Sequence, residues 1–94
     1  GLSGIDSLPE NQRMLFIFPD SGHRSFWMAG MKFSLDIIWI KGDKVVGFSE
    51  NLPPATALNT QLYYSPEPVD KVLETNAGLV RKLNIKVGDA VMLR

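Results

Sequence analysis

The stretch Phe33-Ser34-Leu35-Asp36-Ile37-Ile38-Trp39-Ile40 decides the fold of this chain. In an extended strand, successive side chains point to opposite faces. One face would carry Phe33, Leu35, Ile37 and Trp39, and the other Ser34, Asp36, Ile38 and Ile40. The stretch leads into the turn signal Lys41-Gly42-Asp43-Lys44 and then into the apolar run Val45 to Phe48. Two apolar runs that flank such a turn predict an antiparallel hairpin from Phe33 to Ser49.

Asp36 is the only charged residue within that stretch. An ionised carboxylate among Leu, Ile and Trp side chains is costly unless it is paired or hydrogen-bonded. The alternation makes Asp36 the polar member of a row that otherwise faces the core. We therefore expect Asp36 to be a buried anchor, which accepts backbone N–H bonds or pairs with Arg24 or Lys32.

Four further segments are predicted to be extended. Met14 to Phe18 is an unbroken apolar run bounded by the turn residues Pro19 to Gly22, a pattern typical of a central strand covered on both faces. The other three are Ser25 to Met28, Val69 to Thr75 and Ala90 to Leu93. Gly1 to Arg13 is polar and interrupted by proline, which favours a short turn.

One short helix is predicted from Ala77 to Leu83, with Asn76 as its N-cap and Asn84 as its stop. Upstream of it, Glu50 to Pro68 is a long segment with four prolines. Segments of this length in a small domain are usually functional or disordered. Tyr63-Tyr64 within it supplies apolar area for docking, so we expect the segment to be partly ordered.

The chain of 94 residues has room for a single domain, residues 1–94, with one modest core. Short strands and one helix predict a mainly β fold. The expected architecture is a compact sandwich or jelly-roll-like barrel of about six or seven strands with one short helix.

Composition argues against several classes of function. Lys plus Arg equals Asp plus Glu at 10 each, and this zero formal net charge gives no basic field for a nucleic-acid partner. Without cysteine the chain has no disulfide, zinc–thiolate site or thiol nucleophile. No apolar run is long enough to span a bilayer, so we expect no membrane insertion by this chain. The chain has no glycine-rich phosphate loop and a single histidine, so we expect no cofactor and no metal.

A set of short motifs, spread over nearly the whole chain, resembles one prokaryotic family. The motifs are Gly1-Leu2-Ser3-Gly4, Met14-Leu15-Phe16, Phe26-Trp27-Met28, Leu35-Asp36-Ile37, Tyr64, Val72-Leu73-Glu74, Asn76-Ala77-Gly78 and Gly88-Asp89. Together they resemble DUF192, a domain of unknown function. The resemblance implies a compact, mainly β fold, often exported behind a signal peptide or membrane anchor, with no established activity or catalytic residues. This chain has Ala29-Gly30 where relatives often carry Lys and Asn, and Ile5 where an Arg often stands.

Carboxylates are the residues best suited to catalysis. Asp36 and Glu74 each belong to a predicted strand, and two nearby carboxyls with separated pKa values are the minimal equipment for glycoside hydrolysis. Alternatively, both anchor turns. A Ser-His-Asp triad would need His23 as its base, but no Gly-x-Ser-x-Gly elbow accompanies it.

Aromatic residues form the second candidate site. Trp27 and Tyr64, beside Asp36, Glu74 and Arg24, could hold a saccharide or another small polar ligand, because rings pack on C–H surfaces while polar groups fix hydroxyls. Our leading hypothesis is a non-catalytic accessory or binding module of the cell envelope. A structural or protein-interaction domain is the alternative, and a hydrolase based on the two carboxylates comes third.

Overall fold

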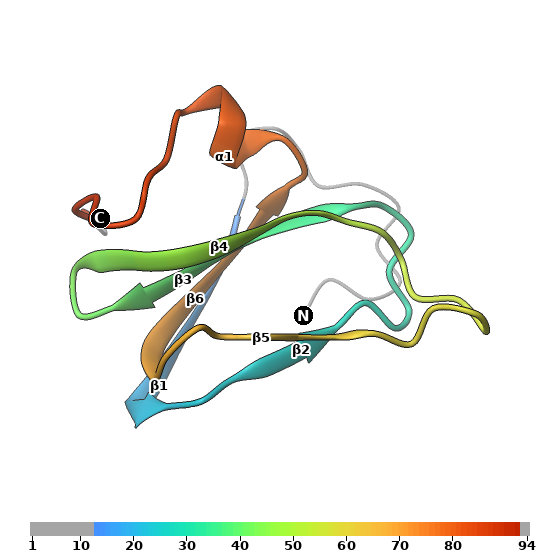
Figure 1. Cartoon of the computed structure of the whole chain (residues 1–94), viewed down its shortest axis with the longest axis horizontal. Helices are drawn as coiled ribbons and strands as arrows, with labels where there is room; N and C mark the ends of the chain where they lie inside the picture. The colour runs from blue at the N-terminus through green and yellow to red at the C-terminus, as the bar shows by residue number, and fades with distance from the viewer. Residues whose placement is uncertain (1–12, 93–94) are drawn as a thin grey trace.

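The structure is a computed structural model and describes residues 13–92. Its elements are β1 (Met14–Gly22), β2 (Ser25–Trp27), β3 (Leu35–Lys41), β4 (Lys44–Leu52), β5 (Leu62–Tyr64), β6 (Val69–Asn76) and α1 (Leu79–Lys82). In this described part, six strands form two antiparallel sheets beside one short helix (Figure 1). The mainly β prediction is confirmed in its sandwich form, and the sheets do not close into a barrel.

The larger sheet has the strand order β1-β6-β3-β4. Strand β3 lies inside it because both of its faces are apolar, and every side chain from Leu35 to Ile40 is buried. The predicted hairpin is confirmed: β3 and β4 pair up to Lys41 and Lys44, and Gly42 in the turn has a φ of 62°. This left-handed backbone conformation suits glycine in a two-residue hairpin turn.

The two faces of β3 pack into two separate apolar clusters. The alternation predicted which side chains share a face, but the sequence predicted only one core. We call the first the inner core; its buried residues are Met28, Leu35, Ile37, Trp39, Leu52, Val69 and Val72. The short β2–β5 ribbon covers this cluster, and the Phe26 ring centroid lies 5.6 Å from that of Phe16 and 5.9 Å from that of Trp39. The ribbon and α1 therefore lie on opposite sides of the larger sheet (Figure 1).

The second cluster, the outer core, lies beneath α1 and the segment that follows it. Its buried residues are Ile38, Ile40, Val45 and Val80. Ile85 and Val91 pack against them from the C-terminal segment. This segment runs alongside the start of β4 and is hydrogen-bonded there: Val45 N donates to Asp89 O at 2.9 Å, and Val91 N donates to Asp43 O at 2.7 Å.

Two strand predictions are wrong in their placement. Met14 to Phe18 is not in a central strand, because β1 pairs only with β6 within the described residues and Ile17 is 66% exposed. Ala90 forms only an isolated bridge with Lys44, so the described part of the predicted last strand is not a strand. Leu93 and almost all of the predicted turn from Gly1 to Arg13 lie outside the described residues.

The long proline-containing segment is partly ordered, as predicted. It contains β5 and a small turn closed by backbone bonds between Thr56 and Asn59. Within residues 13–92, no helix is long and apolar enough to cross a membrane.

Candidate functional site

Asp36 is fully buried and accepts three backbone N–H bonds. Its Oδ1 lies 2.9 Å from the nitrogen of Asn51, at the end of β4. Its Oδ2 lies 3.1 Å from the nitrogen of Gly78 and 3.0 Å from that of Val80, at the start of α1. Because backbone donors surround this carboxylate, its burial is compensated. Asp36 is thus the buried anchor expected from the sequence, bonded to the backbone and not to Arg24 or Lys32.

The same contacts correct the predicted start of the helix. The N-cap is Gly78, with a φ of 95°, and not Asn76. Gly78 has no side chain with which to bond the free N–H groups of the first turn, and the Asp36 carboxylate from β3 bonds to two of them instead. At the other end Asn84 is the stop, as predicted: its φ is 53°, and the bonds Asn84 N to Arg81 O and Ile85 N to Val80 O form a Schellman motif.

Glu74 points away from Asp36. In the β3–β6 register Asp36 pairs with Thr75, whereas Glu74 pairs with Ile37, so the two carboxylates project from opposite faces of the sheet. Glu74 is 7% exposed on the inner-core side, and its Oε2 has no hydrogen-bond partner among the described residues. Burial raises the pKa of this carboxyl above its ordinary value. Two carboxylates on opposite faces of one sheet do not flank a common bond, as an acid–base pair must.

Arg24 is bonded near the β1–β2 connection. Its guanidinium lies 3.9 Å from the centroid of the Phe18 ring, and Nη2 donates to the backbone oxygen of Asp20 at 2.6 Å. Nε donates to the backbone oxygen of Val69 at 3.4 Å. These contacts tie the connection to the first residue of β6. They do not bring the guanidinium to Asp36 or Glu74.

Trp27 and Tyr64 come together on one exposed face. In the β2–β5 register, Ser25 pairs with Tyr64 and Trp27 pairs with Leu62. The intervening pair, Phe26 and Tyr63, packs on the inner core, so the other four side chains point outward. We call Trp27, Leu62 and Tyr64 the aromatic face; they are 54%, 43% and 65% exposed.

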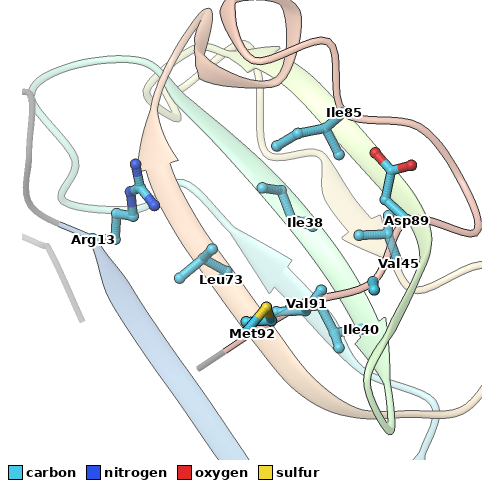
Figure 2. A pocket seen from close by; sticks show the side chains of 10 residues that line it. Arg13, Ile38, Ile40, Val45, Leu73, Ile85, Asp89, Val91 and Met92 are labelled. Atoms are coloured by element: carbon cyan, nitrogen blue, oxygen red, sulfur yellow. The ribbon is translucent and has the colours of Figure 1, made fainter. Parts of the chain in front are cut away.

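A cavity on the other side of the larger sheet was not predicted. This outer cavity has a volume of about 210 Å³. Its apolar lining includes Ile38, Ile40, Val45, Leu73, Ile85 and Val91. Figure 2 shows Arg13 and Asp89 on opposite sides of this apolar lining. The sequence signal was the apolar face of β3, but its covering by residues 85–92 follows from tertiary packing.

No candidate metal centre occurs in the described part of the chain. Across residues 13–92, no group of three or more His, Asp and Glu side chains is placed to hold a metal ion. His23, considered as a base in a triad, is exposed between β1 and β2.

Comparison with known proteins extends the sequence resemblance. The profile of the DUF192 family, described as "Uncharacterized ACR", matches residues 1–93. A crystal structure of a protein of unknown function from Novosphingobium aromaticivorans DSM 12444 is similar, with a TM-score of 0.89 and 31% identity over 99% of this chain. This chain spans 65% of the length of that protein.

A second similar structure is a protein from Sinorhizobium meliloti 1021, provisionally described as a transcription regulator. Its TM-score is 0.87 and its identity 31%, covering 96% of this chain and 68% of the other. Among curated proteins none matches this chain. The family profile extends over the strands, the aromatic face and the Asp36 anchor alike, so the chain belongs to the DUF192 family, whose function is unknown.

Proposed function

We propose that this domain is a non-catalytic binding module that holds a small polar ligand, a saccharide, on the aromatic face. The observation that carries the proposal is the joint exposure of Trp27 and Tyr64 on one side of the β2–β5 ribbon. A tryptophan and a tyrosine that each expose more than half of their surface leave apolar area unburied, which a ligand could cover.

The spacing of the two rings suits a ligand of several linked sugar units. Trp27 pairs with Leu62, so Tyr64 is its diagonal neighbour. Diagonal neighbours across an antiparallel pair are separated by roughly 7–8 Å, within reach of aromatic side chains. Leu62 lies beside Trp27 and extends the apolar area. The C–H faces of adjacent sugar rings could pack on this surface.

The ribbon is fixed from beneath, which supports a preformed site. Phe26 and Tyr63 alternate with the exposed residues and pack on the inner core. A preformed surface costs less entropy on binding than a mobile loop. The polar groups at hand are the hydroxyls of Ser25 and Tyr64, two residues that pair across the ribbon. The side chains of Asp36 and Arg24 make their contacts elsewhere, and Glu74 is buried on the inner-core side of the larger sheet. The proposed site is therefore smaller than the site predicted from the sequence.

The proposed role is non-catalytic because the two candidate carboxylates, Asp36 and Glu74, project from opposite faces of the larger sheet. A protein-interaction domain is the second candidate, favoured by the apolar character of the same face. Zero formal net charge favours a neutral ligand or a protein over nucleic acid.

Nitrogen-15 NMR titration with cellohexaose, chitohexaose and maltohexaose tests the proposal. The two indole N–H signals supply an internal control, because Trp39 is buried and donates to Ser49 Oγ at 3.2 Å. A binding sugar should shift the signal of Trp27 and leave that of Trp39 in place. Trp27→Ala should weaken binding about tenfold, whereas Leu58→Ala, at a side chain 99% exposed off the ribbon, should not.

The two candidate functions give different outcomes in this experiment. If none of the sugars moves the Trp27 and Tyr64 signals, the saccharide proposal is contradicted. A protein ligand that loses affinity on Trp27→Ala, in the absence of any sugar response, would make the domain an interaction module instead.

A further inference from the structure

We infer that the outer cavity is a second binding site, for a small carboxylic acid with an apolar tail. It lies on the side of the larger sheet that faces α1, away from the aromatic face. The inference therefore stands independently of the proposed saccharide site.

The size and walls of the cavity define the apolar part of the ligand. Ile38, Ile40 and Leu73 line it from the sheet, and Ile85 and Val91 from the C-terminal segment. The volume is about 210 Å³. An engineered apolar cavity of about 150 Å³ stays dry and binds benzene. The outer cavity therefore suits a phenyl ring or a chain of about six carbons.

Backbone hydrogen bonds hold the C-terminal wall in place. Val45 N donates to Asp89 O at 2.9 Å, Gly88 N to Val45 O at 2.8 Å, and Val91 N to Asp43 O at 2.7 Å. The helix end is closed by the bond from Ile85 N to Val80 O. Because both ends of the segment are bonded, the cavity is largely formed before a ligand arrives, as small-molecule sites usually are.

The charged side chains on the two sides of the cavity, Arg13 and Asp89, determine which charge the head group of the ligand should carry. The Arg13 side chain makes no hydrogen bond or ion pair with another residue of the described range 13–92, and it is exposed at the cavity. Asp89 is already engaged, because its Oδ2 accepts the N–H of Lys86 at 2.8 Å. The uncommitted cation is therefore on the Arg13 side, and a guanidinium binds a carboxylate with two parallel N–H donors.

Titration with simple acids tests the inference directly. Hexanoate and 3-phenylpropanoate should saturably shift the methyl signals of Ile38, Ile40 and Ile85 in carbon-13 NMR spectra. Acetate, which has the charge without the tail, should not. Hexylamine, which has the tail with the opposite charge, should bind more weakly than hexanoate.

Two variants separate the head-group contact from the cavity. Arg13→Gln should weaken hexanoate binding about fivefold, and the matched control Arg81→Gln, on the exposed side of α1, should leave it unchanged. Ala90→Leu should abolish binding, because Ala90 lines the cavity and the larger leucine side chain would fill it. Ala90 is exposed, so the substitution removes no side chain from the core. Trp27→Ala should keep full hexanoate binding.

Three results would overturn the inference: no saturable methyl shift with either acid, equal affinity for hexanoate and hexylamine, or unchanged hexanoate binding in both Arg13→Gln and Ala90→Leu. If Ala90→Leu fails to fold, the comparison of ligands and the Arg13→Gln pair still decide the outcome. If the parent protein binds hexanoate but none of the sugars, the proposed function alone is contradicted.

Discussion

Oδ2 of Asp36, in β3, lies 3.0 Å from the backbone nitrogen of Val80, in α1, although the two residues are 44 positions apart in the sequence. The same carboxylate holds the nitrogens of Gly78 and Asn51. One buried side chain thus connects the interior strand β3 to the end of β4 and to the start of the helix. The helix that covers the outer core is therefore positioned by a strand, and not by a cap of its own.

Asp36→Asn should lower the free energy of unfolding by about 2–4 kcal/mol, because an amide has one acceptor oxygen for three N–H donors and turns a donor toward them. Urea denaturation measures the loss. Hydrogen exchange at Gly78 and Val80 should speed up more than at other protected amides. The matched control is Asp43→Asn in the exposed hairpin turn, with an expected change within about 0.5 kcal/mol. Equal stability of the two variants would contradict the anchor role.

Glu74 should make stability fall as the pH rises. Burial raises the pKa of the Glu74 carboxyl in the folded protein above its ordinary value of 4.5. As the pH rises, this carboxyl therefore loses its proton at a lower pH in the unfolded chain than in the folded protein. The carboxyl's contribution to stability is complete below pH 4.5 and decreases as the pH rises through the folded pKa. Glu74→Gln should remain more stable than the parent chain at neutral pH and lose that advantage in acid. Urea midpoints at several pH values check this, and two parallel pH profiles would refute it.

Asp70 should show the opposite pH dependence. Its Oδ1 accepts the N–H of Gly42 in the hairpin turn at 2.9 Å, and this bond lowers the pKa of the carboxyl below the ordinary 3.8. Lys71 Nζ adds a contact to Asp70 Oδ2 at 3.1 Å and donates to Gly42 O at 2.8 Å. The stabilisation is present above pH 3.8 and is lost as the pH falls through the folded pKa.

Asp70→Asn should therefore cost a modest amount of stability at neutral pH, well below the cost of Asp36→Asn, and nothing at the acid end. Thermal unfolding at neutral and acid pH makes the comparison. A stability difference that stays constant across this range would show that the charge of Asp70 is not what the Gly42 contact requires.

Gly47→Ala should destabilise the fold by about 1–3 kcal/mol through overpacking. A Cβ at this position in β4 would lie 2.8 Å from Cγ of Pro66 and 3.7 Å from Cδ1 of Trp39. A proline ring cannot rotate away as a flexible side chain would. Combining Gly47→Ala with Pro66→Ala should recover most of the loss, measured as a double-mutant cycle by urea denaturation with Pro66→Ala as the reference. Additive losses would mean that the ring is not the obstacle.

Sequence reasoning succeeded where the signal is local. The alternation from Phe33 to Ile40 assigned side chains to the two faces of β3, which the structure places in the inner and outer cores, and the turn after Lys41 identified the hairpin. Asn84 ends the helix because a left-handed residue there completes the local backbone bonds. Each of these rests on neighbours within a few positions of the chain.

The sequence pattern did not predict features that depend on residues far apart in the chain. An apolar run looks the same at the edge of a sheet as in its middle, so β1 was misplaced. Asn76 precedes the helix as a good cap would, but a carboxylate from β3 reaches the free N–H groups instead. The residues of the predicted site lie apart for the same reason. Glu74 and Thr75 are neighbours in a strand and face opposite sides of the sheet, and the strand register places Thr75, not Glu74, on the same face as Asp36.

The sequence by itself determined the mainly β character, the hairpin around Gly42, the burial of Asp36 and the DUF192 membership of the chain. Only the tertiary structure decided which backbone groups bond Asp36, that Trp27 and Tyr64 share an exposed face, and that side chains of the segment 85–92 line one side of a cavity over the sheet. The physical reason is that side-chain alternation and turn geometry depend on adjacent residues, whereas strand order, register and packing depend on contacts between segments far apart in the chain.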